Sequence, residues 1–249
     1  MKTRGTAGGH NAPPRGALQL DGDGQPIYGQ RNVVDLPRLA ELGLPFWLAG
    51  GYGTPARLGE ALSMGAAGVQ IGTAFALCRE SGLTESNRRA LRALSASGEA
   101  RVYTDPLASP TGFPFKVAPL AGTLSDDEVF RRRERVCDLG FLRRVYRRED
   151  GRLGYRCPSE PVDEYLRKGG AVEDTAGRKC LCNALLANVG LAQVRADGEE
   201  ASLLTVGNHL ETLGPLVSGI DLAVADVAHY LCAAPEPLRV EGKGASDGE

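Results

Sequence analysis

Between residues 35 and 77, a helix pattern followed by an apolar strand pattern occurs twice in succession. The first helix pattern begins at Asp35, and the apolar run 44–51 follows it. The second begins at Thr54, and the apolar run 68–77 follows it. Helices that alternate with continuous apolar strands are typical of a parallel sheet with both faces covered. The pattern therefore predicts an α/β fold.

The flanking sequence is less regular. Residues 1–34 are rich in glycine and proline and predict loop, with a brief strand at the very start. Residues 102–117 contain too many prolines for regular structure, and the arginine-rich residues 125–168 are expected to be helical in parts. Amphipathic or apolar patterns predict three further helices, at 84–97, 180–193 and 220–233.

Glycine is abundant, 33 of 249 residues, and it marks the strand ends. A bound phosphate needs backbone N–H groups with no Cβ in the way, and a threonine hydroxyl can add a donor. The alternative is that these glycines only make tight turns. Three glycine-containing sequences stand at predicted strand ends: Gly8-Gly9-His10, Ala49-Gly50-Gly51-Tyr52 and Gly72-Thr73-Ala74-Phe75.

The sequence GTAGGH at residues 5–10, together with residues 45–81 (PFWLAGGYGTPARLGEALSMGAAGVQIGTAFALCRES), resembles the C-terminal half of the flavin-dependent nitronate monooxygenase family. The family is also called 2-nitropropane dioxygenase-like, and the resemblance extends over residues 5–82. It implies FMN as cofactor, and it implies a (β/α)₈ barrel whose strand ends carry the active site. The residues that correspond to the family's cofactor-binding positions are Gly9, Ala49, Gly50, Gly51, Gly72 and Thr73.

The same resemblance makes His10 the catalytic residue, since the family's histidine faces the reactive side of the flavin. A neutral imidazole can take a proton from a nitroalkane or give one to a developing carbanion. The alternative role for His10 is to orient its loop. We expect His209 and His229 to have surface or structural roles.

Four later sequences are similar to a longer branch of the superfamily, which includes trans-acting enoyl reductases of polyketide and polyunsaturated fatty-acid synthases. The sequence as a whole leaves three functions open. The first is oxidation of nitroalkanes or nitronates with oxygen. The second is reduction of an enoyl thioester, with an acyl carrier protein as partner. The third is a non-catalytic metal-binding or interaction module. The four sequences are SPTGFPFKV (109–117), CDLGFLRR (137–144), YRCPSEP (155–161) and GRKCLCNALLA (177–187).

The predicted fold is thus the C-terminal portion of a TIM-type (β/α)₈ barrel with a mainly helical C-terminal extension. We expect the barrel strands and helices in residues 1–117, the extension in 118–234 and a disordered tail in 235–249. The family's barrel has five further strands before the glycine–histidine strand. We therefore expect a fragment, a product of a split gene or a degenerate relative, with a separate N-terminal half as a possible partner.

The net charge of −2, the pI near 6.0 and the absence of a long apolar run argue against nucleic-acid binding and membrane insertion. We expect a cytoplasmic protein with reduced thiols. No metal is expected, because the spacing of the four cysteines that could bind zinc or an iron–sulfur cluster matches no known pattern. Nine arginines between residues 131 and 152 favour a solvated face, or a surface for an acidic partner. The four cysteines are Cys137, Cys157, Cys180 and Cys182.

Overall fold

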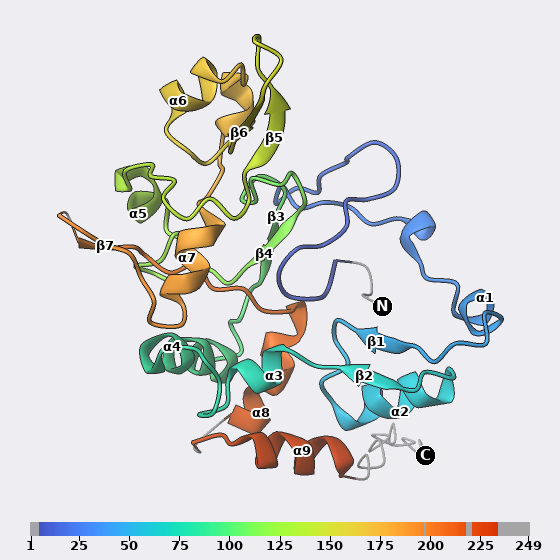
Figure 1. Ribbon diagram of the computed structural model, residues 1–249. Helices are drawn as coiled ribbons and strands as arrows, with labels where there is room; N and C mark the ends of the chain where they lie inside the picture. The colour runs from blue at the N-terminus through green and yellow to red at the C-terminus, as the bar shows by residue number, and fades with distance from the viewer. Residues whose placement is uncertain (1–4, 197, 218–220, 234–249) are drawn as a thin grey trace, which may run out of the picture.

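The computed structural model describes residues 5–196, 198–217 and 221–233, which form short helices and two-stranded sheets (Figure 1). None of the helices in these ranges is long and apolar enough to cross a membrane. Up to residue 102 the elements are η1 (Gln30–Asn32), α1 (Leu36–Ala40), β1 (Trp47–Ala49), α2 (Pro55–Ser63), β2 (Gly68–Gln70), α3 (Thr73–Ala76) and α4 (Glu85–Ala96).

The β1–α2–β2 unit confirms the predicted order of helix and parallel strand. Strands β1 and β2 pair in parallel, with Trp47 opposite Gly68. Helix α1 begins where the Asp35 carboxylate accepts the Arg38 N–H, and α2 where the Thr54 hydroxyl accepts the Arg57 N–H. An apolar cluster lies between the strand pair and the helices, with Phe46, Leu48, Tyr52, Ala61 and Ala66 at its centre.

The second predicted strand, residues 68–77, is correct only at its beginning. Strand β2 ends at Gln70, and Gly72 caps α3 in a helical conformation, with its carbonyl accepting the Ala76 N–H. Leu77 is completely buried in the main core. The apolar run therefore continues through a strand and a helix, a distinction that apolar content alone does not make.

The prolines of residues 102–117 do not exclude regular structure. Strands β3 (Tyr103–Asp105) and β4 (Phe115–Val117) form an antiparallel hairpin, and its prolines lie in the connection. Residues 9–11 add to the outer side of β4, where the Lys116 N–H donates to the Gly9 carbonyl at 3.0 Å. The expectation of irregular structure here was wrong for these two strands.

The C-terminal region contains the expected helices and two hairpins that the sequence did not predict. The 180–193 helix is confirmed as the shorter α7 and the 220–233 helix as α9, while the 84–97 helix is confirmed as α4 in the preceding region. The start of the chain before residue 5 and the predicted tail lie outside the described residues. The elements are α5 (Asp127–Arg132), β5 (Arg144–Arg147), β6 (Leu153–Arg156), α6 (Val162–Arg167), η2 (Val172–Thr175), α7 (Leu181–Ala187), β7 (Val194–Arg195), β8 (Gly198–Glu199), η3 (Asn208–Leu213), α8 (Gly214–Val217) and α9 (Val224–Cys232).

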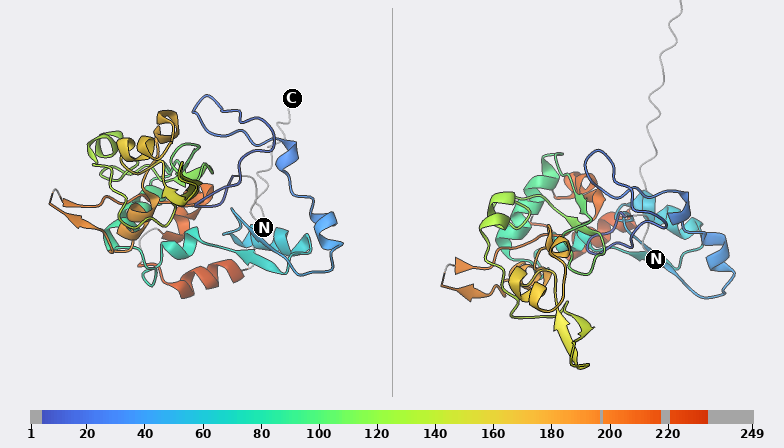
Figure 2. Two further views of the ribbon diagram at one scale, coloured as in Figure 1. Left: turned by 45° about the horizontal axis from the view of Figure 1, so that its top comes forward. Right: turned by 90° about the horizontal axis from the view of Figure 1, so that it is seen from above.

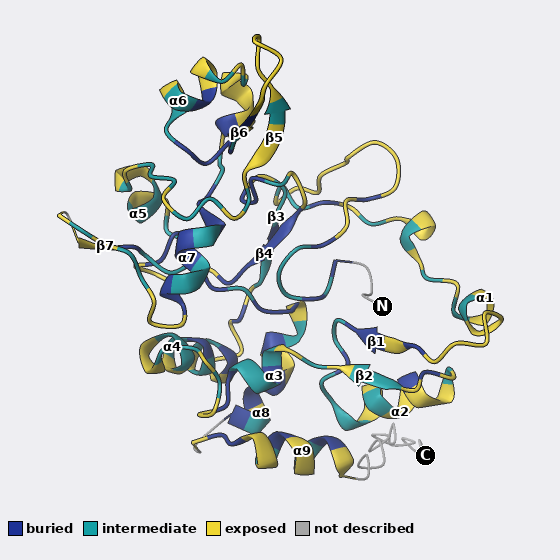
Figure 3. Ribbon diagram, in the orientation of Figure 1, coloured by how far each residue is buried: buried dark blue, intermediate teal, exposed yellow. Residues whose placement is uncertain are grey.

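The largest core joins residues from both sides of residue 117. Leu77 and Leu91 pack in one cluster with Leu204, Leu210 and Val227. The buried stretches of α3, α7 and α8 are dark blue in Figure 3. The β5–β6 hairpin, in contrast, projects from the rest of the molecule (Figure 2). Within the described ranges the strands form four separate pairs and no closed barrel, and β1–β2 is the one parallel pair among them.

Candidate functional site

A cavity of about 440 Å³ lies at the end of the β1–β2 pair. Four separate segments line it. Three come from the first 102 residues, and the fourth runs from Thr205 into η3. The lining residues are Thr6, Ala7, Gly8, Gly9, Ala49, Gly50, Gly51, Tyr52, Gly53, Gln70, Ile71, Gly72, Thr73, Ala74, Ala76, Thr205, Val206, Gly207, His209, Thr212 and Leu213.

All the residues predicted to bind the cofactor line this one cavity. They reach it because β1 and β2 are parallel, so that their carboxyl ends meet at the same edge. Segment 5–9 lies beside that edge, and the Thr6 hydroxyl donates to the Gly50 carbonyl at 3.0 Å. The structure thus brings together Gly9, Ala49, Gly50, Gly51, Gly72 and Thr73.

The Gly50–Gly51 turn requires glycine at both positions. Their φ angles are +92° and +93°, which residues with a side chain rarely adopt. A Cβ at Gly51 would also lie 2.3 Å from Nε2 of His209. Glycine is therefore required at Gly50 and Gly51 by the positive φ angles, and at Gly51 also because the imidazole of His209 leaves no room for a Cβ.

Residues 204–207, which precede η3, pack against the glycine turns. The Gly207 N–H donates to the Thr73 hydroxyl at 2.9 Å, and the Gly9 N–H donates to the Thr205 hydroxyl at 2.7 Å. A Cβ at Gly207 would lie 2.9 Å from the Thr6 carbonyl oxygen. The C-terminal region thus closes one side of the cavity through close backbone contact.

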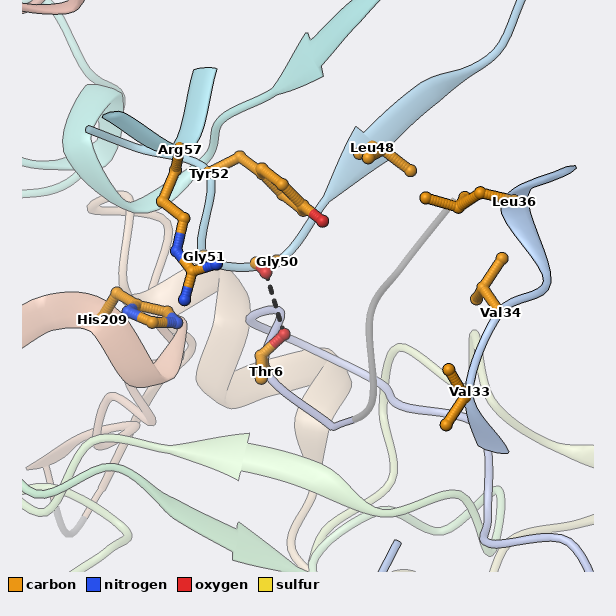
Figure 4. Close-up of a pocket in the computed structure, with 10 residues that line it drawn as sticks. All are labelled: Thr6, Val33, Val34, Leu36, Leu48, Gly50, Gly51, Tyr52, Arg57 and His209. Atoms are coloured by element: carbon orange, nitrogen blue, oxygen red, sulfur yellow. Dashed lines mark hydrogen bonds between the residues drawn. The ribbon is translucent and has the colours of Figure 1, made fainter. Parts of the chain in front are cut away.

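A second cavity, of about 380 Å³, adjoins the first and shares part of its wall (Figure 4). Val33, Val34, Leu36 and Leu48 give it an apolar side. Arg57 and His209 lie together on the opposite side, next to the Gly50–Gly51 turn (Figure 4). Thr6, Gly50, Gly51, Tyr52 and His209 line both cavities.

His209 is the histidine that the structure places in both cavity walls, although the sequence suggested a structural role. Burial lowers its pKa, and the nearby Arg57 guanidinium lowers it further, while Glu211 raises it. The neutral imidazole is therefore favoured. The only local signal was the preceding Gly207-Asn208 turn, because the contact with Gly51 joins positions far apart in the chain.

His10 does not join these residues. It follows Gly9 in the chain, but it is absent from the described lining of both cavities. Its Nε2 lies 2.6 Å from the Ser109 hydroxyl, and its ring packs edge-on against Phe115. His10 is thus held against the β3–β4 hairpin, at the border of the site that was predicted to contain it.

Four of the six cysteines form two interacting pairs. All six cysteines are free thiols. Cys137 interacts with Cys157, and Cys180 with Cys182, so that the thiol of one member stabilises the thiolate of the other and lowers the pKa of Cys137 and Cys182. Within the described residues, no group of three or more His, Cys, Asp or Glu side chains is arranged to hold a metal ion.

The nine arginines do not all belong to one solvated face. Arg133 is largely buried and pairs with Glu200 at 2.5 Å. Arg135 donates to the carbonyls of Pro158 and Thr175. These arginines join distant segments of the C-terminal region, while the exposed ones lie mainly on the β5–β6 hairpin.

The family model described as nitronate monooxygenase matches residues 4–102. No curated protein matches the chain. Residues 4–102 are therefore similar to the nitronate monooxygenase family, whose enzymes are generally flavin-dependent. The matched segment contributes three of the four segments that line the first cavity.

Proposed function

We propose that the protein is an FMN-dependent oxidoreductase of the nitronate monooxygenase type, and that FMN binds in the cavity at the end of β1 and β2. The observation that carries the proposal is the convergence of Gly9, the Gly50–Gly51 turn and Gly72-Thr73 in one wall. Residues 4–102, which match the family, contain all of these positions.

The cavity suits the phosphate end of a flavin nucleotide. Its volume of about 440 Å³ lies within the range of small-molecule sites, roughly 300–1,000 Å³. No Asp or Glu occurs among the described residues that line it. A Cβ at Gly9 or Gly72 would meet open space, so a ligand can approach these positions closely, while the Gly9 N–H already donates to the Thr205 hydroxyl. The phosphate would be held by these turns, with the Thr73 hydroxyl as a further donor.

Bound FMN would supply the electron transfer by which a nitronate is oxidised with oxygen. The chain's own contribution is to bind and orient. The glycine turns would fix the phosphate end, while residues 205–207 hold two of these turns through hydrogen bonds to Gly9 and Thr73. We assign proton transfer from a nitroalkane to His10, whose Ser109 contact would have to open toward the substrate.

Reduction of an enoyl thioester, with an acyl carrier protein as partner, is a second candidate. The specific observation is that Ser109, which contacts His10, belongs to the sequence 109–117 that resembles the enoyl reductase branch. Asn11 also donates its N–H to the Pro114 carbonyl in the same sequence at 2.8 Å. This sequence therefore packs directly on the glycine–histidine turn.

The test is to load the purified chain with FMN and to assay two reactions in parallel. One mixture contains a nitronate and oxygen, and the other contains an enoyl thioester and a reduced nicotinamide. Turnover of the nitronate is the expected result. Turnover of the enoyl thioester alone would favour the second candidate. A chain that retains no flavin spectrum after gel filtration would contradict both.

A further inference from the structure

Two side chains that can carry a positive charge, those of Arg57 and His209, lie beside the Gly50–Gly51 turn, and neither belongs to the glycine turns (Figure 4). His209 lies against the Gly50–Gly51 turn, with its Nε2 2.3 Å from where a Gly51 Cβ would be. Arg57 lies near the N-terminus of helix α2, and its side chain lies beside Gly50 and Gly51 (Figure 4). His209 lies outside the segment that matches the family.

The charged side chains around the Gly50–Gly51 turn favour the binding of an anion. Together the two cavities contain Arg57 and His209, and no carboxylate occurs among the residues described as lining them. The carboxylate nearest in sequence to Arg57 on α2 is Glu60, which pairs with it at 2.5 Å on an exposed surface. Glu211 on η3 acts on the imidazole from its own element.

We propose that His209 and Arg57 bind the anionic group held by the Gly50–Gly51 turn, which is the FMN phosphate if the proposed function is correct. The C-terminal region then supplies a ligand contact as well as a wall. A charge-assisted hydrogen bond from a cationic side chain to phosphate is stronger than a bond between neutral groups. Arg57 can turn from the exposed Glu60 to the phosphate at little cost.

Binding should also take up a proton. Without a ligand, burial and Arg57 disfavour the imidazolium of His209, whereas Glu211 favours it. The phenol of Tyr52, in both cavity walls, has a raised pKa and stays neutral. A phosphate beside the ring would raise the pKa of His209. The affinity for FMN should therefore fall as the pH rises from about 6 to about 8, around the ordinary pKa of histidine.

The experiment compares FMN with riboflavin, which lacks the phosphate, in fluorescence titrations of the full chain. His209→Gln should weaken FMN binding by roughly 10-fold or more, the effect of losing one charge-assisted hydrogen bond, and leave riboflavin binding unchanged. The pH dependence of FMN affinity should become flatter in this variant. His229→Gln is the matched control, since His229 is exposed on α9. Arg57→Gln should show the same selectivity for FMN.

Equal losses for both flavins in His209→Gln would overturn the inference, since they would show that the ring only shapes the cavity. Unchanged FMN affinity would also overturn it. A wild-type chain that binds neither flavin would contradict the proposed function instead. In that case, inorganic phosphate is titrated while the imidazole resonances are followed by NMR. A raised pKa of His209 alone among the three histidines would support the anion site, and no change would overturn it.

Discussion

The region up to residue 102 and the region that follows it differ in what they bury. In the first region, the buried polar side chains are Asn11 and Ser95, and no charged side chain is buried among its described residues. In the second, Lys116, Glu160, Lys179 and Glu200 are all buried. A core of apolar side chains can be predicted from periodicity, whereas a buried charge depends on a partner that the sequence pattern does not identify.

The largest expected effect comes from Glu200, whose side chain is 1% exposed and pairs with Arg133 and Arg195. Glu200→Ala should lower the free energy of unfolding by about 3–5 kcal/mol, because it leaves the largely buried Arg133 without its partner. Urea unfolding monitored by circular dichroism measures the change. Glu85→Ala is the control for an exposed pair with Arg89 and should cost less than about 1 kcal/mol. Similar losses in both variants would contradict the contrast between the regions.

The contact between the two regions can be tested at Gly51. Gly51→Ala places a Cβ against the His209 ring at a φ of +93°. We expect a loss of about 1–3 kcal/mol in stability from the strained backbone, together with loss of FMN binding. Gly59→Ala is the matched control within helix α2, where a Cβ meets open space, and should stabilise the protein by about 0.5–1 kcal/mol. Normal FMN affinity in Gly51→Ala would contradict the account of the site.

Lys116 tests the cost of a buried charge. Burial lowers its pKa to about 8, and its ammonium group donates to the Thr104 hydroxyl. In the unfolded chain Lys116 has its ordinary pKa of 10.5. Between about pH 8 and pH 10.5 the unfolded chain therefore binds the ammonium proton and the folded protein does not, so the free energy of unfolding should rise with pH in this range. Lys116→Met should remove that rise and should make the protein more stable near pH 7, by about 1–3 kcal/mol. The measurement is urea unfolding at several pH values between 7 and 10. An equal rise of the unfolding free energy with pH in Lys116→Met would show that other titrating groups cause it.

The smallest effect concerns the cysteine pairs, which lie in the second region. The Cys180 thiol and the N–H groups of Phe141 and Leu142 lower the pKa of Cys182 to about 6. Cys182 should therefore be alkylated by iodoacetamide at pH 7 as a thiolate, and its reaction should slow below pH 6. Mass spectrometry of a Cys232→Ser variant, which lacks the exposed cysteine, follows the reaction. An ordinary thiol profile for Cys182 would show that the pair does not form in solution.

The sequence predicted the first region well because its signals are local. Asp35, Thr54 and Thr84 accept backbone N–H groups where their helices begin, as their positions suggested. The glycine turns that the sequence singled out lie together in the lining of one cavity. The sequence did not indicate that Thr205 and His209 complete it, because those contacts join residues more than 130 positions apart. The β3–β4 hairpin was missed because the prolines of residues 102–117 argued against regular structure, and the β5–β6 hairpin because its strands are short.

The central claim is that one flavin site is built from both regions, and amide hydrogen exchange with and without FMN tests it most directly. Peptides that cover residues 49–53 and 70–76 should exchange more slowly when FMN is bound, and so should a peptide that covers 205–213. Peptides of the projecting β5–β6 hairpin should not change. Protection of the first two segments without any at 205–213, or protection centred on the hairpin, would contradict the account.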